Sequence, residues 1–350
     1  MKFIVLAASL AIVYSKTYKM ELRSTGSLRT RVMTNEKNQN YPAMGNVANG
    51  QLLEKRLVPF RDYYDLYVGN VTIGTPGQNM SLLTDTGSAN LWVFDTTCRV
   101  QELIVNIICT GATIENQDFI RVTEADDAFL FMPIDGILGL GRSGITVGKV
   151  TSPLQNILGN LDASLFTIWM DDKLSKKDGK TGLITFGAVD TINCHPAINY
   201  VPLSSKSHWQ FAMEGFSIGS FSQKKREQVV SDSGTSWIGA PSEIIEAIVN
   251  QTNAVYSSLN KFYTVNCSTT TNQPDLIFTI NGIKYDVSPK EYILDIGVGD
   301  GKCVLAFFEI LTGSMTTDWI LGAPWIGTYC NVFDIGQKRI GFAKSKHSEI

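Results

Sequence analysis

A short motif occurs once in each half of this chain. Residues 82–88 read Leu-Leu-Thr-Asp-Thr-Gly-Ser, and residues 229–235 read Val-Val-Ser-Asp-Ser-Gly-Thr. Each copy is followed downstream by the sequence Ile-Leu-Gly, at 137–139 and at 320–322. A single Asp-Ser/Thr-Gly sequence is typical of an ordinary turn at the end of a strand. Two copies with matching downstream pieces indicate a duplicated lobe.

The residue types in the motif suit the presentation of a carboxylate. A strand that ends in Asp places the carboxylate at the tip of a turn. Gly87 and Gly234 allow a tight turn and let the backbone approach the carboxylate and a substrate closely. The hydroxyls of Ser88 and Thr235 can donate hydrogen bonds to the outer carboxylate oxygens and fix their orientation.

If the two lobes meet about a pseudo-twofold axis, Asp85 and Asp232 lie close together. Two carboxylates at such a separation cannot both ionise readily, so the pair retains one proton. One carboxylate can then act as general base on a shared water molecule, and the other as general acid on a substrate carbonyl. The motif therefore predicts hydrolysis by paired aspartates, with no metal ion and no cofactor.

Composition argues against other chemistries. The chain has three histidines, and neither His195 nor His208 lies in a metal-binding or Ser-His-Asp motif, while His347 lies in the tail. There is no Cys-x-x-Cys pair of the kind found in zinc ribbons. A net charge of −3 without a Lys/Arg cluster excludes a typical nucleic-acid-binding protein.

From Tyr64 onward the pattern is typical of β-structure, because short apolar runs are interrupted by Gly and Asn at close spacing. The clearest predicted strands are Leu66–Ile73, Met80–Thr84, Asn90–Phe94, Gly182–Phe186 and Leu276–Ile280. Helices are predicted at Pro153–Leu158 and Ser242–Gln251. The sequence thus predicts an all-β, mostly antiparallel fold.

The N-terminal segment is predicted to direct secretion. Lys2 precedes the apolar run Phe3–Val13, so residues 1–15 have the pattern of a signal peptide, with a buried N-terminal strand as the alternative. Residues 16–58 carry eight Lys/Arg and three Glu ahead of an acidic remainder. A basic segment of this kind is attracted to the acidic remainder of the chain until the carboxylates are protonated. This charge pattern predicts a propeptide at 16–58. The alternative is a solvated basic tail.

A secretory route has consequences for modification and location. The six cysteines are expected to form disulfides, and their spacing leaves the pairing open. Glycosylation is predicted at the sequons of Asn70, Asn79 and Asn250. No later segment offers 18 apolar residues, so no membrane span is predicted. We therefore expect a protein that is secreted or lysosomal.

Four stretches resemble the pepsin-like aspartic proteases of type A1, above all their nematode members. They are residues 85–93 (Asp-Thr-Gly-Ser-Ala-Asn-Leu-Trp-Val), 134–141, 231–241 and 319–343. The resemblance runs from about residue 64 to residue 343. It implies a bilobal fold with lobes at 59–200 and 201–350 around a deep cleft. It also implies a monomeric zymogen that hydrolyses protein or peptide substrates in acid and binds pepstatin-type inhibitors and its own propeptide.

The resemblance also carries over residue by residue. It implies that Asp85 and Asp232 are the catalytic pair and that Trp92 is a supporting residue. For Trp92 and Trp237, packing in the core is the preferred interpretation. The residues that orient the pair or contact substrate are then Thr86, Gly87, Ser88, Ser233, Gly234 and Thr235. The implied disulfides are Cys267–Cys303, Cys194–Cys330 and, on the weakest grounds, Cys98–Cys109.

The first lobe departs from the family pattern in length. The interval from Asp85 to Gly139 spans 54 residues, whereas that from Asp232 to Gly322 spans 90, so the N-terminal lobe is 36 residues shorter. In the family this interval holds the flap, a hairpin that carries a Tyr and closes over the substrate. The sequence predicts that the flap is missing.

Other features of the interval agree with this prediction. No Tyr lies between Tyr67 and Tyr200, and the apolar run Leu103–Cys109 has no obvious family counterpart. Loss of a lid is expected to lower rate and affinity and to expose sheet edges. The alternative function is therefore a catalytically weak, pepsin-like peptide-binding protein. Two smaller departures are Ser233, where Thr is commoner, and Thr84, where an apolar residue is usual.

Overall fold

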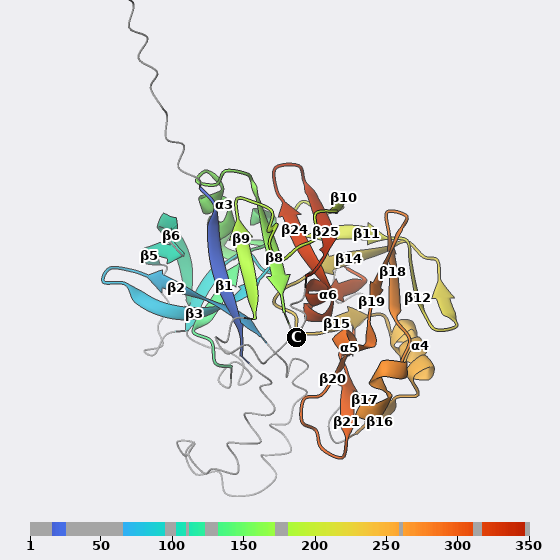
Figure 1. Ribbon diagram of the computed structural model, residues 1–350. Helices are drawn as coiled ribbons and strands as arrows, with labels where there is room; N and C mark the ends of the chain where they lie inside the picture. Colours follow the sequence, from blue (N-terminus) through green and yellow to red (C-terminus); the bar gives the residue numbers. More distant parts are fainter. Residues whose placement is uncertain are drawn as a thin grey trace, which may run out of the picture.

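The computed structural model describes residues 16–25, 66–94, 103–109, 112–122, 132–171, 181–258, 262–310 and 317–346. Two groups of strands lie side by side, the blue-to-green N-terminal half and the yellow-to-red C-terminal half (Figure 1). The predicted all-β, bilobal fold is confirmed. The predicted signal peptide, most of the predicted propeptide and Cys98 lie outside the described residues.

The local predictions agree closely with the observed elements. The strand β9 (Gly182–Phe186), the strand β18 (Leu276–Ile280) and the helix α3 (Pro153–Leu158) have the predicted bounds. Helix α3 begins after Ser152, whose side chain accepts a hydrogen bond from the backbone N–H of Gln155, which is the usual role of an N-cap serine. Helix α4 (Ser242–Thr252) extends one residue beyond its prediction.

The first half contains a closed ring of strands. Its members are β2 (Tyr67–Ile73), β3 (Gln78–Asp85), β4 (Leu91–Phe94), β5 (Leu103–Cys109), β6 (Ala112–Val122) and β7 (Gly136–Gly139). They follow the order β2-β3-β7-β4-β6-β5, and β5 returns to β2 through the pairs Thr72↔Ile108 and Ile73↔Ile107. Paired strands have no free edge. The expectation that the shortened interval leaves sheet edges exposed is therefore wrong at the positions where β2 and β5 pair.

A central sheet joins the two halves. It adds β8 (Leu165–Met170), β9, β1 (Tyr18–Ser24), β10 (Asn199–Pro202), β24 (Tyr329–Asp334) and β25 (Arg339–Lys344). The order is β10-β25-β24-β8-β9-β1-β2, so strands from the end of the chain pair with strands of the first half (Figure 1). Strand β1, within the predicted propeptide, lies between β9 and β2 and fully buries Met20 and Leu22.

The second half consists of smaller sheets and short helices. The strands are β11 (Gln210–Met213), β12 (Gly215–Ile218), β13 (Phe221–Gln223), β14 (Glu227–Ser231), β15 (Ile238–Ala240), β16 (Val255–Ser257), β17 (Phe262–Asn266), β18, β19 (Ile283–Val287), β20 (Ile293–Leu294), β21 (Lys302–Leu305), β22 (Phe307–Glu309) and β23 (Trp319–Leu321). The helices are α4, α5 (Pro289–Tyr292) and α6 (Ala323–Thr328). None of the helices among the described residues has the length and apolar character needed to cross a membrane.

The register of the strands explains the repeated motif. In the first half β3 runs parallel to β7 and pairs Leu83 with Ile137. In the second half β14 runs parallel to β23 and pairs Val230 with Ile320. Each Ile-Leu-Gly sequence therefore lies beside the strand that leads to the aspartate of its own half, and the predicted duplication is confirmed.

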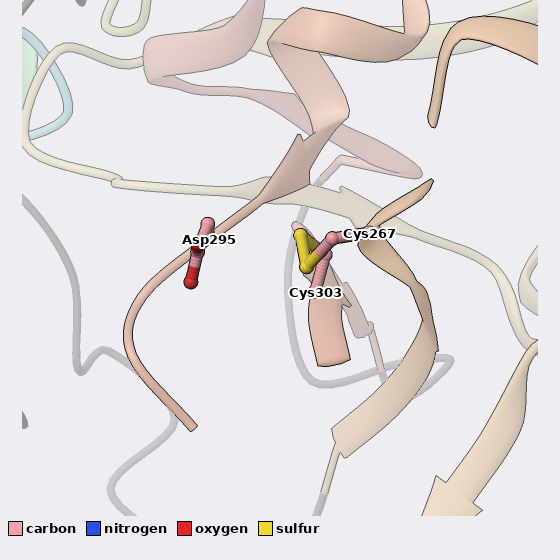
Figure 2. Close-up of side chains that lie close together, drawn as sticks. All are labelled: Cys267, Asp295 and Cys303. Carbon is pink, nitrogen blue, oxygen red and sulfur yellow. A yellow bond between two sulfur atoms is a disulfide. The ribbon is translucent and has the colours of Figure 1, made fainter. Parts of the chain in front are cut away.

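The two disulfides whose residues are described are those that the resemblance implied. Cys194 bonds Cys330, and Cys267 bonds Cys303. Asp295 lies beside the second bond (Figure 2), and these three residues form the group in the described part of the chain whose ligand atoms are close enough for a metal ion. Because the two sulfurs are bonded to each other, they are not thiolate ligands, and the group is not a metal site.

Candidate active site

The first motif turn holds its carboxylate in place with its own residues. Strand β3 ends at Asp85. The backbone N–H of Gly87 donates to Asp85 Oδ1 at 2.8 Å, and the hydroxyl of Ser88 donates to Asp85 Oδ2. The carboxylate is therefore oriented by two donors within the next three residues.

The second turn repeats this arrangement after β14. The backbone N–H of Gly234 donates to Asp232 Oδ1 at 2.9 Å, and the hydroxyl of Thr235 donates to Asp232 Oδ2 at 2.6 Å. The orienting role predicted for the last hydroxyl of each motif thus matches the geometry in both turns.

The middle hydroxyl of each motif joins the two turns. Thr86 Oγ1 donates to the carbonyl of Ser231 at 3.0 Å and accepts the backbone N–H of Ser233 at 2.9 Å. Reciprocally, Ser233 Oγ donates to the carbonyl of Thr84 at 2.8 Å and accepts the backbone N–H of Thr86 at 3.1 Å. Thr86 and Ser233 are buried. Their place is therefore the junction between the lobes, not a surface that contacts substrate.

The motif glycines show how close the two carboxylates lie. A Cβ atom placed on Gly87 would lie 2.7 Å from Asp232 Oδ2, and one placed on Gly234 would lie 2.5 Å from Asp85 Oδ1. Each glycine therefore packs against the carboxylate of the opposite turn. The structure brings the predicted pair together across the junction of the lobes.

The environment favours a proton on the pair. Burial raises the pKa of Asp85 well above its ordinary value, and the neighbouring charge of Asp232 raises it further. The hydrogen bonds from Ser88 and Gly87 act in the opposite direction but are smaller effects. Two interacting carboxyl groups titrate as a unit, so the raised pKa of Asp85 is a property of the pair. The pair therefore keeps one proton well above pH 4.

This shift predicts a pH-dependent stability. A carboxyl group whose folded pKa exceeds its unfolded value of about 3.9 binds a proton more tightly when folded, so the free energy of unfolding falls as the pH rises from about 4 toward the folded pKa. In Asp85→Asn the free energy of unfolding should fall less steeply with rising pH than in the parent. We therefore expect the variant to gain stability relative to the parent at neutral pH. Urea unfolding between pH 4 and pH 7 measures the effect.

The exposed Asp300 provides the control for this prediction. Asp300→Asn removes an exposed acidic group and should leave the pH dependence of stability as in the parent protein. An Asp85→Asn variant whose stability declines as steeply as that of the parent would show that the pair does not hold a proton in this range.

The two tryptophans that follow the motifs pack into apolar clusters. Trp237 is buried beside Phe262 and Val304. Trp92 is partly buried against a cluster that includes Leu83, and its ring meets Phe94 edge to face at 5.6 Å. The preferred interpretation of core packing is confirmed for both residues.

Other residues reach the site without any signal in the sequence. The indole N–H of the fully buried Trp209 donates to the carbonyl of Leu140 at 2.9 Å, and the backbone carbonyl of Trp209 accepts the N–H of Ser231. These bonds connect residues far apart in the chain, so no local spacing could predict them.

Comparisons with known proteins agree with this geometry. A family model described as "Eukaryotic aspartyl protease" matches residues 66–107 and 104–345. Aspartic protease 1 of Caenorhabditis elegans is 40% identical over 98% of this chain and 97% of the relative. Cathepsin D of Dictyostelium discoideum is 30% identical over 82% of this chain and 85% of the relative.

The family match is interrupted inside β5. Its two segments share residues 104–107, and the alignment with Aspartic protease 1 runs over 392 positions although this chain has 350 residues. The expectation that Leu103–Cys109 has no family counterpart is therefore wrong, because both matched segments enter this run. The alignment with Aspartic protease 1 is also at least 42 positions longer than this chain, so the relative carries segments that this chain lacks.

Proposed function

Because this chain belongs to the eukaryotic aspartyl protease family and is an aspartic-type endopeptidase, we propose that Asp85 and Asp232 are its catalytic pair. The observation that carries the proposal is the mutual packing of the two turns, in which each glycine lies against the opposite carboxylate. Nothing else in the described residues combines two adjacent carboxyl groups with donors that fix all four oxygens.

The proposed reaction needs water and one proton on the pair. The ionised carboxylate accepts a proton from water as the water oxygen bonds to the peptide carbonyl carbon, and the protonated carboxyl group gives its proton to the carbonyl oxygen. A tetrahedral diol results. The C–N bond then breaks as the carboxyl group that took its proton from water gives this proton to the amine nitrogen, and the other carboxylate accepts a proton from a diol hydroxyl. A carboxylic acid and an amine result, and the pair again holds one proton. The raised pKa of Asp85 supplies that proton, because the pair still holds one proton at the acidic pH where we propose that the protein acts.

We also propose that the protein is made as a zymogen. Strand β1 belongs to the predicted propeptide, yet it pairs on both sides in the central sheet and buries Met20 and Leu22. A propeptide built into the sheet is a folding element as well as a basic segment. Its release therefore requires both chain cleavage and loss of these strand pairs.

The proposed location is the secretory route, ending outside the cell or in the lysosome. The two disulfides are consistent with an oxidising compartment. Asn70, Asn79 and Asn250 are exposed, as glycosylated residues must be. We propose that the protein acts there as a monomeric glycoprotein on protein or peptide substrates and binds pepstatin-type inhibitors.

A second function is favoured by the shortened first lobe. The interval from Asp85 to Gly139 spans 54 residues, against 90 from Asp232 to Gly322, and the family match is divided into two segments that overlap in β5. A site without a lid excludes water poorly and holds substrate less firmly. The alternative is therefore a pepsin-like protein that binds peptides in its cleft and turns them over weakly.

One experiment separates the two functions. The proform is expressed, incubated near pH 3.5 with a denatured protein substrate, and assayed with and without pepstatin, while pepstatin binding is measured by calorimetry. Cleavage that pepstatin abolishes supports the endopeptidase. Binding of pepstatin by a folded protein that does not cleave the substrate supports the peptide-binding alternative and contradicts efficient catalysis.

A further inference from the structure

The residue before each motif aspartate carries a hydroxyl group. These residues are Thr84 and Ser231, and both have 0% of their surface exposed. A buried hydroxyl costs free energy unless it forms a hydrogen bond. Their side chains are too deeply buried to touch a substrate, so any influence on the reaction must act through the neighbouring turns.

Thr84 forms one hydrogen bond within its own lobe and one to the opposite lobe. Its hydroxyl donates to the carbonyl of Tyr67 in β2 at 3.1 Å. Its own carbonyl accepts the hydroxyl of Ser233, from the opposite turn, at 2.8 Å. The ladder between β2 and β3 ends at the pair Val68↔Leu83. The hydroxyl of Thr84 therefore ties β3 to β2 just beyond the end of that ladder, directly before Asp85.

Ser231 has the equivalent pair of bonds. Its hydroxyl donates to Asn331 Oδ1 in β24 at 2.9 Å, and its carbonyl accepts the hydroxyl of Thr86 at 3.0 Å. Asn331 is fully buried and is itself fixed, because its side-chain N–H donates to the carbonyl of Tyr329 at 2.8 Å. The anchor is therefore a rigid acceptor and not a mobile surface group.

The two anchors lie in the same sheet. Tyr67 pairs with Ser24 of β1, and Asn331 pairs with Ile168 of β8, so both belong to strands of the central sheet. The residue before each aspartate is thus bonded in two directions. Its hydroxyl donates to the central sheet, and its backbone carbonyl accepts a hydrogen bond from the turn of the other lobe. These bonds have the same form in the two lobes.

We propose that Thr84 and Ser231 are positioning residues, which set the separation of the two carboxylates by tying each turn to the central sheet. The proposal rests on the proposed roles of Asp85 and Asp232. Within the described residues, Asp232 is the charged group that acts on Asp85. If either tie is lost, the turns can move apart, and the repulsion that keeps a proton on the pair weakens.

The test compares two substitutions at Thr84 with a matched control. Thr84→Val keeps the shape and removes the hydroxyl, whereas Thr84→Ser keeps the hydroxyl. The control is Thr185→Val in β9, because the hydroxyl of Thr185 is buried and has no hydrogen-bond partner in the described part of the chain. Loss of one hydrogen bond is expected to lower kcat about tenfold in Thr84→Val. KM should change less than about twofold, because Thr84 is fully buried and does not contact substrate.

The pH dependence of kcat distinguishes a positioning role from a purely structural one, because a purely structural role would leave it unchanged. Weaker repulsion raises the lower apparent pKa of the pair and lowers the upper one, so the bell-shaped profile of kcat narrows in Thr84→Val. Thr84→Ser should restore both the rate and the width, and Thr185→Val should keep both. The proposal is overturned if Thr84→Val has the parent's profile, or if Thr84→Ser fails to restore it.

Two further measurements cover the remaining outcomes. If Thr84→Val does not fold, Ser231→Ala tests the equivalent tie and should narrow the profile in the same way. If the parent protein does not cleave substrate, the proposed function fails, but the pH dependence of urea unfolding still reports the pair. That dependence should be shallower in Thr84→Val than in the parent and in Thr185→Val, and equal slopes would refute the positioning role.

Discussion

Asp85→Asn and Asp232→Asn are each expected to lower kcat/KM for a denatured protein substrate by roughly four orders of magnitude, as loss of an essential member of a catalytic set does. The carboxamide has nearly the shape of the carboxyl group it replaces. It cannot exchange the proton that the pair must move between water and substrate. The loss should therefore appear in kcat, with the fold intact. Initial rates near pH 3.5, with unfolding midpoints measured alongside, test this expectation.

The effect should be confined to the pair. Asp300→Asn changes an exposed aspartate in the same protein and should keep the parent's activity. Activity within tenfold of the parent in either variant of the pair would contradict the assignment. Equal loss in the Asp300 control would show instead that the preparation, and not the pair, is affected.

The second large effect is expected from a single methyl group. In Gly234→Ala the new Cβ would lie 2.5 Å from Asp85 Oδ1, closer than the 3.0 Å that real Cβ atoms essentially always keep. Asp85 cannot simply move away, because Gly87 and Ser88 hold both of its oxygens. The turn must shift or the carboxylate must rotate. Since small displacements of catalytic groups cost about 100-fold in rate, we expect kcat to fall by at least that factor.

Gly87→Ala should behave in the same way, because its Cβ would lie 2.7 Å from Asp232 Oδ2. Gly159→Ala is the matched control: this glycine has φ −64°, and a Cβ there meets no atom within 4 Å. The control should keep its activity and be slightly more stable, by about 0.4–1 kcal/mol. If Gly234→Ala retains more than a third of the parent's kcat, the two turns do not pack as closely as described.

Much of the fold and the site follows from local patterns. The motif around Asp85 and its copy around Asp232 predict the turns, the orienting hydroxyls and the duplicated lobes, because all of these depend on neighbouring residues and on their repetition. The bounds of β9 and α3 follow in the same way from apolar spacing and an N-cap serine. The disulfide pairs required the family resemblance, since spacing leaves the pairing of six cysteines open.

Long-range contacts decide the rest. No local pattern shows that β5 closes on β2, that Thr86 and Ser233 join the lobes, or that Thr84 and Ser231 are tied to the central sheet. Such contacts depend on which surfaces meet when the halves pack. The amino-acid sequence identifies the two carboxyl groups and their turns because that chemistry is local. The separation and protonation of the pair come from packing, since burial and the neighbouring charge arise only after residues from opposite halves of the chain meet.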